Sequence, residues 1–474
     1  MSSSPAVVIG LDAGTTSAKM VAVDAQGTIQ ASAESDPIPT QAPSPGASIQ
    51  HPSAIWDALA TACRQGLSTL DRSTPVTAVA LAAQSGSVAP VERLDGQLDS
   101  SFSTWMDKRS RDLVSSWDAS KRKAIRTLSG WNPAPGLGLS TICWLRAEAA
   151  VEARRWLSVD DFLIHELTGS WVTNPSNAAG MQLMDVSSLE WSPELCEMAG
   201  IEATALSALL PSGERAGQLT ASAAEATQLA QGTPVVVGGH DQSCAALSLG
   251  VTAPGSALLS LGTAWVVTMV TDRADPAAVP KGFNLSPHVV QDRWAVSKHL
   301  GGLGPALAAE MVGEVTELEA GLGQPTPSID DPYFLPAFRA VDRAKSEQFS
   351  GLASTSRIER LRAVMEACAF EARLALEQAS SSVPVVELTV VGGGTNSRYL
   401  TQQIADVAGV PLTVRRETSQ PAMGAAMLAA RASGWLAFDA ATTPAETILP
   451  SRRYGDTTDR RYAEYRRLTS GDER

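Results

Sequence analysis

The sequence predicts an α/β protein made of two similar domains. At 474 residues, the chain is longer than one ordinary hydrophobic core can organise. Short runs rich in valine, isoleucine and leucine alternate with segments in which apolar residues recur at helical spacing. The pattern L-x-x-G-T occurs at 11–15 and again at 259–263, each time between two strand-like runs. We therefore expect two related domains that face each other.

Local patterns predict the individual elements. A glycine between two strand-like runs indicates a β-hairpin, and apolar residues three and four apart indicate a helix with one buried face. These patterns predict hairpins at 6–24 and 257–270, strands at 76–82, 234–239 and 385–391, and helices at 56–70, 360–378 and 421–431.

Composition narrows the classes of function. The net charge of -13 argues against a nucleic-acid partner or an anionic membrane, because both need clustered Lys and Arg. Phosphate compounds stay open, since backbone N–H groups bind anions without adding charge. The five cysteines are scattered without a C-x-x-C pair, which favours reduced thiols over a zinc or redox site. The sequence shows neither a signal-peptide pattern nor an apolar stretch of about 20 residues, so we expect a cytoplasmic protein.

The first hairpin carries groups suited to a phosphate. Gly14 permits close approach of the backbone, and the Thr15 and Thr16 hydroxyls add donors. Lys19 adds a positive charge. An ordinary hairpin turn would have a similar sequence, but Asp12 favours the phosphate interpretation, because a carboxylate ending an apolar strand needs a partner. Hydrated Mg²⁺ is the natural one, since it takes one or two carboxylates plus phosphates.

The second hairpin repeats the turn with Gly262 and Thr263. It has Ser260 at the position of the first hairpin's aspartate. If both hairpins hold one nucleotide, the metal belongs on the first half.

Asp241 is the candidate base. It follows a strand and two glycines and begins a helix of small residues, which places a carboxylate at a domain junction. Phosphoryl transfer to a hydroxyl benefits from a group that accepts the hydroxyl proton. The competing interpretation is a helix N-cap, a frequent role of Asp. The neighbouring His240 is interpreted as a packing or hydrogen-bonding residue.

Two further segments suit ligands. The glycines at 392–394, between a strand and a helix, let backbone approach a flat ring or a phosphate, although no Walker Lys-Ser/Thr follows them. In TWMDKR, residues 104–109, Trp105 and Asp107 offer an aromatic face and polar groups for a sugar. An exposed helix start capped by Asp107 is the alternative for this segment.

Taken in order, these segments resemble the FGGY family of carbohydrate kinases from residue 9 to about residue 430. GLDAGTTSAKMVAVD resembles its opening phosphate motif, WMDKR its W-x-D-x-R segment, and DFLIHELTGSWVTNPSNAAGMQLMDVSSLEW the stretch closing the insert of the first domain. VVVGGHDQSCAALSLG resembles the segment with the catalytic aspartate, and LLSLGTAWVV the second phosphate motif. VVGGGTNSRYLTQQIADVAGVPL and QPAMGAAMLAA resemble the adenosine motif.

The resemblance implies two actin-like, ribonuclease-H-like ATPase domains with an interdomain cleft. Residues 1–244 would bind sugar and Mg²⁺ and supply the base, and residues 245–474 would bind the nucleotide. The implied roles are base for Asp241, metal for Asp12, phosphate binding for Gly14, Thr15, Thr16, Lys19, Gly262 and Thr263, adenosine binding for Gly393, Gly394, Asn396 and Ser397, and substrate binding for Gln84, Ser85, Gly86, Trp105, Asp107 and Asp241.

One segment departs from the family pattern. Xylulokinases have Gln-Met-His-Gly where this chain has Gln84, Ser85, Gly86 and Ser87, and the smaller residues are expected to leave room for a different or larger sugar. The expected reaction transfers the γ-phosphoryl group of ATP, with Mg²⁺, to a primary hydroxyl of a ketopentose such as xylulose or ribulose. The alternatives are a kinase of a polyol or larger ketose and an ATPase switch acting on a protein partner. A homodimer is compatible with each.

Overall fold

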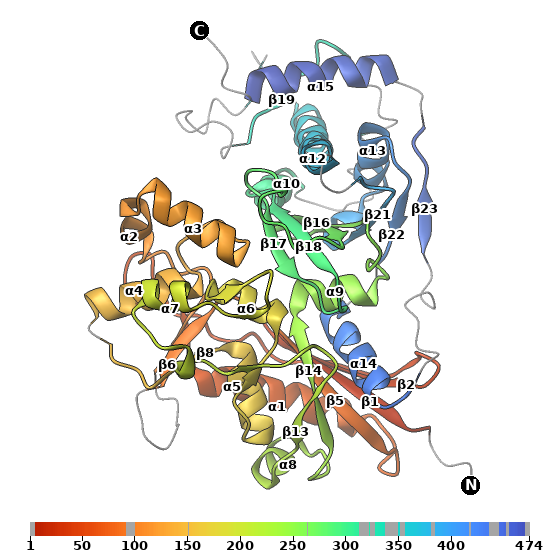
Figure 1. Cartoon of the computed structure of the whole chain (residues 1–474). Coiled ribbons are helices and arrows are strands. Elements are labelled where there is room, and N and C mark those ends of the chain that lie inside the picture. Colours follow the sequence, from red (N-terminus) through yellow and green to blue (C-terminus); the bar gives the residue numbers. More distant parts are fainter. Residues whose placement is uncertain are drawn as a thin grey trace.

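The structure is a computed structural model of the whole chain (Figure 1). It describes residues 5–91, 100–149, 151–262, 264–311, 322, 328–336, 349–350, 356–380, 384–416, 419–435, 445–451 and 455–469.

Two mixed β-sheets form the centres of the two halves. The first has six strands in the order β13-β14-β5-β1-β2-β3, and the second has seven in the order β17-β18-β16-β15-β21-β22-β23. The strands of the first are β1 (Val7–Ala13), β2 (Ala18–Asp24), β3 (Ile29–Glu34), β5 (Val76–Ala83), β13 (Arg215–Gln218) and β14 (Pro234–His240). Those of the second are β15 (Ser256–Leu261), β16 (Trp265–Thr271), β17 (Asn284–Pro287), β18 (Trp294–His299), β21 (Glu387–Val391), β22 (Leu412–Val414) and β23 (Glu446–Ile448).

The two sheets share one plan. In the first, β1 pairs antiparallel with β2 and parallel with β5, which in turn pairs parallel with β14. In the second, β15 pairs antiparallel with β16 and parallel with β21, which pairs parallel with β22. The repeated L-x-x-G-T pattern lies at the same place in both, at the end of the first hairpin strand. The predicted duplication is confirmed at the level of strand order and direction.

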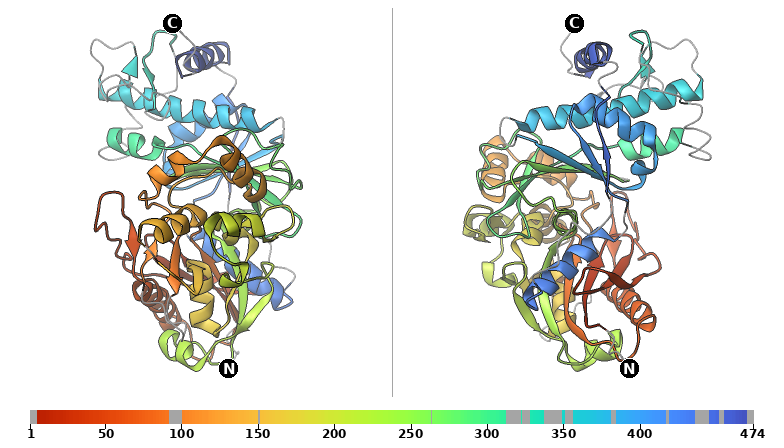
Figure 2. Two further views of the ribbon diagram at one scale, coloured as in Figure 1. Left: turned by 60° about the vertical axis from the view of Figure 1, so that its left-hand side comes forward. Right: turned by 90° about the vertical axis from the view of Figure 1, so that its right-hand side faces the viewer.

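Helices cover both sheets (Figures 1 and 2). On the first sheet, residues of α1 (Pro52–Ser68), α5 (Val159–Thr168) and α8 (Ala221–Thr227) share one core cluster with the strands. On the second, α10 (Leu303–Glu310), α12 (Arg357–Ser380), α13 (Arg398–Ala408) and α15 (Gly455–Thr469) share another. The predicted helices near 56–70, 360–378 and 421–431 are all present, the last as α14 (Gln420–Ala432).

An insertion in the first half supplies the remaining elements. Its helices are α2 (Arg111–Ser116), α3 (Ala119–Ser129), α4 (Gly138–Glu148), α6 (Pro175–Met181) and α7 (Pro193–Ala199), with the short helix η1 (Ala203–Ala205). One small sheet has four strands in the order β4 (Ile49–Gln50), β7 (Phe102–Ser103), β6 (Val88–Val91) and β8 (Arg155–Ser158). Two further sheets have two strands each: β10 (Met184–Asp185) pairs with β11 (Glu190–Trp191), and β9 (Val172–Thr173) pairs with β12 (Ala208–Leu209). In the second half β19 (Tyr333–Phe334) pairs with β20 (Phe349–Ser350).

The insertion is bonded to the second sheet. The Trp131 indole N–H donates to Ser286 Oγ at 2.9 Å, and the Leu285 N–H donates to the Gly130 carbonyl at 2.9 Å. Asn132 donates its backbone and side-chain N–H groups to Asn284 Oδ1 at 3.0 and 2.9 Å. The segment after α3 is therefore held against β17 by directional bonds as well as by packing.

Helix α14 crosses back from the late sequence to cover the first sheet. It lies against β1 in Figures 1 and 2, and it shares a core cluster with β1, β2, β5 and α9 (Asp241–Ser248). A Cβ on Gly10 would lie 1.8 Å from the Ala422 carbonyl oxygen, and a Cβ on Gly424 would lie 1.9 Å from the Cys244 carbonyl oxygen. Only glycine permits both approaches.

All five cysteines are free thiols. Within the described ranges, every helix is too short or too polar to cross a membrane.

Replacing Gly424 by Ala should destabilise the protein by about 1–3 kcal/mol, the usual cost of overpacking. In an open helix the same change stabilises by about 1 kcal/mol, but here the new methyl group meets the backbone of α9 at 1.9 Å. Thermal unfolding of G424A measures the effect. Gly455→Ala is the matched control, because no atom of the described residues lies within 4 Å of the place its methyl group would take; equal midpoints for the two variants would contradict the close packing.

Candidate active site

The carboxyl ends of three parallel strands bring the candidate residues together. In the pairing register, Asp12 near the end of β1 lies opposite Ala82 of β5, and His240 at the end of β14 lies opposite Ala83. Asp241 follows at once as the first residue of α9. Because these strands run in one direction, Asp12 and Asp241 lie at the same edge of the sheet.

Asp12 is a buried carboxylate with an unsatisfied oxygen. Its residue is 6% exposed, and Oδ1 has no hydrogen-bond partner in the part of the chain that the structure describes. Burial, followed by the nearby Asp241 charge, raises the pKa of Asp12 to about 8, although Lys19 acts in the opposite direction. A buried carboxylate of this kind is stable only when it is protonated or when a cation lies beside it.

Asp241 is held through one of its two oxygens. Oδ1 accepts the Gln242 backbone N–H at 2.6 Å and lies 3.0 Å from His240 Nε2. The side chain is 25% exposed, which leaves it open to a small ligand. The helix N-cap position belongs to His240. The N-cap interpretation of Asp241 is therefore wrong, because the helix begins one residue earlier than that interpretation requires.

A buried hydrogen-bond chain supports this strand end. The His240 backbone N–H donates to Ser176 Oγ at 2.9 Å, and that hydroxyl donates to Asn174 Oδ1 at 2.6 Å. Asn174 in turn donates to Asp160 Oδ2 at 3.0 Å. Sequence reasoning missed these residues, although Asn174 before Pro175 is a typical helix start.

The first glycine turn is closed by Gly14, whose N–H donates to the Ser17 carbonyl at 3.2 Å. Thr16 at its tip is exposed. Lys19 Nζ lies 3.7 Å from Glu34 Oε1, and its side chain is 28% exposed. This long ion pair leaves the ammonium group accessible to another anion.

Thr15 joins the turn to the predicted sugar segment. Its hydroxyl donates to Gln84 Oε1 at 3.0 Å and accepts the Trp105 indole N–H at 2.9 Å. Ser87 Oγ donates to the same Gln84 oxygen at 3.0 Å. Three residues predicted at separate sites, for phosphate and for sugar, therefore form one network.

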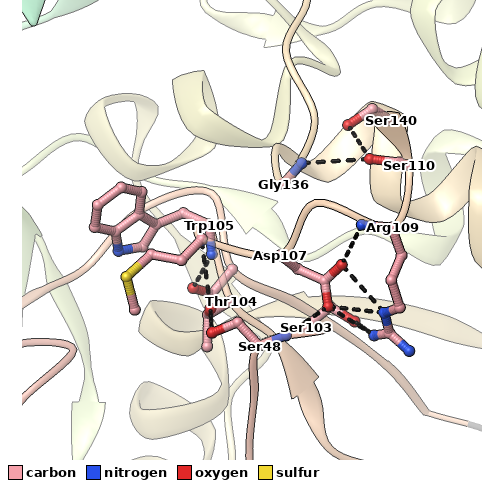
Figure 3. A network of polar contacts seen from close by, with 11 residues as sticks. Ser48, Ser103, Thr104, Trp105, Asp107, Arg109, Ser110, Gly136 and Ser140 are labelled. Carbon is pink, nitrogen blue, oxygen red and sulfur yellow. Dashed lines mark hydrogen bonds and ion pairs between the residues drawn. The ribbon is translucent and has the colours of Figure 1, made fainter. Parts of the chain in front are cut away.

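Asp107 is engaged within the protein (Figure 3). Its residue is 3% exposed, and its oxygens accept the Ser48 N–H at 3.0 Å and the Arg109 N–H at 2.9 Å. The Arg109 guanidinium also pairs with it at 2.8 Å and stacks on the Trp144 ring at 4.4 Å. The exposed-cap interpretation is wrong, because Asp107 is buried and α2 begins after Ser110.

Ser85 and Gly86 are packed against the insertion. Ser85 Oγ donates to the Asn177 carbonyl at 2.8 Å. Gly86 has φ +89°, and a Cβ there would lie 3.1 Å from the Leu137 side chain and 3.4 Å from Trp105 Cβ. A side chain at position 86 would therefore be crowded by its neighbours, and the expectation of room for another sugar stays a prediction.

The candidate nucleotide residues line the edge of the second sheet. Gly393 is exposed, and a Cβ on it would meet no atom of the described residues within 4 Å. Gly394 packs on Leu261, one residue before Gly262. In the short helix η4 (Gly393–Asn396), Asn396 is exposed. Ser397 is buried, and its Oγ accepts the Leu400 N–H at 3.2 Å as the cap of α13. Thr263 lies outside the described residues.

Comparison with known proteins decides the family. The profile "FGGY family of carbohydrate kinases, N-terminal domain" matches residues 7–248, and the C-terminal domain of the same family matches residues 259–433. The chain belongs to the FGGY family of carbohydrate kinases. As a member, it is a phosphotransferase that acts on a carbohydrate hydroxyl with ATP. The two-domain FGGY fold expected from the sequence is confirmed.

Similar proteins extend over nearly the whole chain. A xylulose kinase of Klebsiella pneumoniae is 28% identical over 475 residues, covering 96% of this chain and 96% of the relative. An apulose kinase of Pectobacterium atrosepticum is 28% identical over 453 residues, covering 90% of each. The crystal structure of xylulose kinase from Rhodospirillum rubrum has a TM-score of 0.89 at 26% identity and covers 98% of both chains.

In this FGGY kinase, Asp160 gives stability an unusual pH dependence. Burial raises the pKa of Asp160 to about 8, with the Asp161 charge as the next cause. An unfolded aspartate releases its proton near pH 4, whereas the folded state keeps it until about pH 8. The folded state thus binds more protons across this window, so this group's contribution to stability falls as pH rises from 4 to 8.

Asp160→Asn should remove that fall, because the amide keeps an acceptor oxygen but has no proton to lose. We expect the unfolding midpoint of D160N, relative to that of the unmutated protein, to improve steadily between pH 5 and 8. Asp161→Asn is the matched control: burial raises the pKa of Asp161 only to about 6, so its relative gain should level off above that pH. A constant difference for D160N would contradict the prediction.

Proposed function

We propose that this kinase transfers the γ-phosphoryl group of ATP to a primary hydroxyl of a ketopentose, with Asp241 as the general base. The observation that carries this proposal is the position of Asp241. It stands at the sheet edge beside Asp12 with Oδ1 hydrogen-bonded and its side chain partly exposed. A partly exposed carboxylate is suited to accept the acceptor's hydroxyl proton as the new oxygen–phosphorus bond forms.

Mg²⁺ is the cation proposed for Asp12. The residues present fit this ion. Mg²⁺ keeps most of its waters and takes few protein ligands, and Asp12 offers one buried carboxylate with an oxygen that lacks a hydrogen-bond partner among the described residues. The described residues contain no cluster of three or more His, Cys, Asp or Glu that would form a complete metal cage. When bound, Mg²⁺ would neutralise charge on the ATP phosphates.

The remaining groups are assigned to the nucleotide from the family motifs that they match. Gly14, Thr16 and Lys19 offer donors on the first turn, and Gly262 with Thr263 would contact the phosphates from the second. Gly393, Gly394 and Asn396 would border the adenosine, supported by the open space at Gly393. For Ser397 the proposed role is indirect, because its hydroxyl already caps α13.

The acceptor is proposed from the relatives and the sugar segment. Xylulose, the acceptor named for the Klebsiella and Rhodospirillum proteins, is a ketopentose. Trp105 provides an aromatic surface, and Gln84, Ser85 and Gly86 lie beside it. Asp107 would act by fixing the loop of Trp105, since its own oxygens are engaged.

A panel of ketopentoses, other ketoses and polyols tests the reaction by coupled ADP release. We expect a ketopentose to give the highest kcat/KM, and Asp241→Asn to bind sugar and ATP while losing about 10²–10⁴ in kcat. ADP release that does not depend on the sugar would indicate a simple ATPase instead. Near-normal turnover of D241N would remove Asp241 from the base role.

Asp12→Asn should raise the Mg²⁺ concentration for half-maximal activity by at least about tenfold, because the metal loses its carboxylate. The variant should also be at least as stable as the unmutated protein, since it removes a carboxyl whose ionisation is opposed by burial and by the Asp241 charge. Mg²⁺ titrations and thermal unfolding measure the two effects. An unchanged Mg²⁺ requirement would show that the metal is held elsewhere.

A further inference from the structure

We propose that His240 is a positioning residue that makes Oδ2 the basic oxygen of Asp241. The proposal rests on the function above, because it takes Asp241 as the base. The sequence interpretation gave His240 only a packing or hydrogen-bonding role. The imidazole is therefore a feature of this chain that the general assignment leaves unused.

Two nitrogen groups lie close to the same oxygen of Asp241. Oδ1 accepts the Gln242 backbone N–H at 2.6 Å and faces His240 Nε2 at 3.0 Å. In the described part of the chain, Oδ2 has no hydrogen bond. A carboxylate oxygen that accepts one hydrogen bond and lies beside an imidazole nitrogen is less available to a new proton than an oxygen with neither neighbour. The proton from the acceptor hydroxyl therefore goes to Oδ2.

The backbone of His240 is fixed by the neighbouring residues. The His240 backbone N–H is bonded to Ser176 Oγ at 2.9 Å, and its side chain is only 17% exposed. The preceding Gly239 has no space for a side chain, because a Cβ there would lie 2.2 Å from Val289 and 2.9 Å from Ser176 Oγ. The strand end thus has little freedom, and a residue with little freedom can orient its neighbour accurately.

Other charged groups near Asp241 act at longer range. Asp12 faces it from β1. His299, which keeps an exposed surface at the end of β18, has a lowered pKa because protein atoms displace solvent around it and because His240 is near. Lys108 lies in the same neighbourhood, and burial lowers its pKa. The nearest polar groups to the carboxylate are the Gln242 N–H, which donates to Oδ1, and His240 Nε2, which lies 3.0 Å from the same oxygen.

The step balances without a proton from His240. The acceptor O–H bond breaks and its proton moves to Asp241 Oδ2, while the oxygen's electron pair forms the bond to the γ-phosphorus. The bond between that phosphorus and the bridging oxygen breaks, and ADP leaves with the electron pair. His240 keeps its Nε2–H throughout, so a neutral donor of the same reach should replace it.

Three variants of His240 test the assignment. His240→Gln places an amide N–H near the position of Nε2, His240→Asn has the same amide one carbon shorter, and His240→Leu has no donor. We expect H240L and H240N to lose about 10–100-fold in kcat, since a carboxylate misplaced by about 1 Å costs up to about 10². KM for ATP and sugar should change less than about threefold. H240Q should recover most of the kcat.

Several outcomes would overturn the proposal. Equal kcat for H240N and H240Q would show that the donor's reach is irrelevant, and this comparison remains decisive even where H240L does not fold. Raised KM for the sugar at unchanged kcat would make His240 a substrate contact. Losses of equal size in all three variants would indicate proton transfer by the imidazole. Assayed in parallel, D241N separates the two hypotheses: an active D241N removes the proposed function, whereas an inactive D241N with a fully active H240L removes only the role of His240.

Discussion

The carboxylates of Asp12 and Asp241 lie close enough for each charge to oppose the other, and the first of them is buried. No isolated strand or helix would hold two such groups together. The sheet does so because β1, β5 and β14 run in the same direction and end side by side. The fold thereby maintains a charge repulsion that a bound cation would offset, and it places the proposed base next to the proposed cation site.

The position of Asp241 depends on a helix from the far end of the chain. Along its length α9 packs on α14, which reaches the backbone of α9 at Gly424 and that of β1 at Gly10. Ser248 Oγ also donates to Gln420 Oε1 at 2.6 Å, joining the end of α9 to the start of α14. The second half of the sequence therefore fixes the position of the proposed base, which the first half supplies. The bonds between the insertion and β17 link the halves a second time.

The features predicted correctly from the sequence are those that depend on residues close together in the chain. Both glycine hairpins, the strands that follow them and the three strongest helices formed where their patterns indicated, because period and turn chemistry are local. The errors involve contacts between distant residues. Asp107 had an exposed helix cap as its alternative interpretation, but Ser48, 59 residues away, helps to bury it. The hydrogen bond from His240 to Ser176 joins residues that are 64 apart in the sequence, and no local sequence pattern predicts it.

The Thr15 hydroxyl connects the chemistry of the donor to that of the acceptor. It donates a hydrogen bond to Gln84 and accepts one from Trp105, so the hydroxyl is engaged within the protein both as a donor and as an acceptor. The phosphate turn is then fixed by the residues assigned to the sugar, and a sugar that displaces Trp105 also disturbs the turn. Under the proposed function, selectivity for the acceptor and placement of the γ-phosphoryl group would both depend on this shared network. Ser85 and Gly86 are tightly packed beside this network. Their packing favours selection of the sugar by a rigid site over selection by an enlarged one.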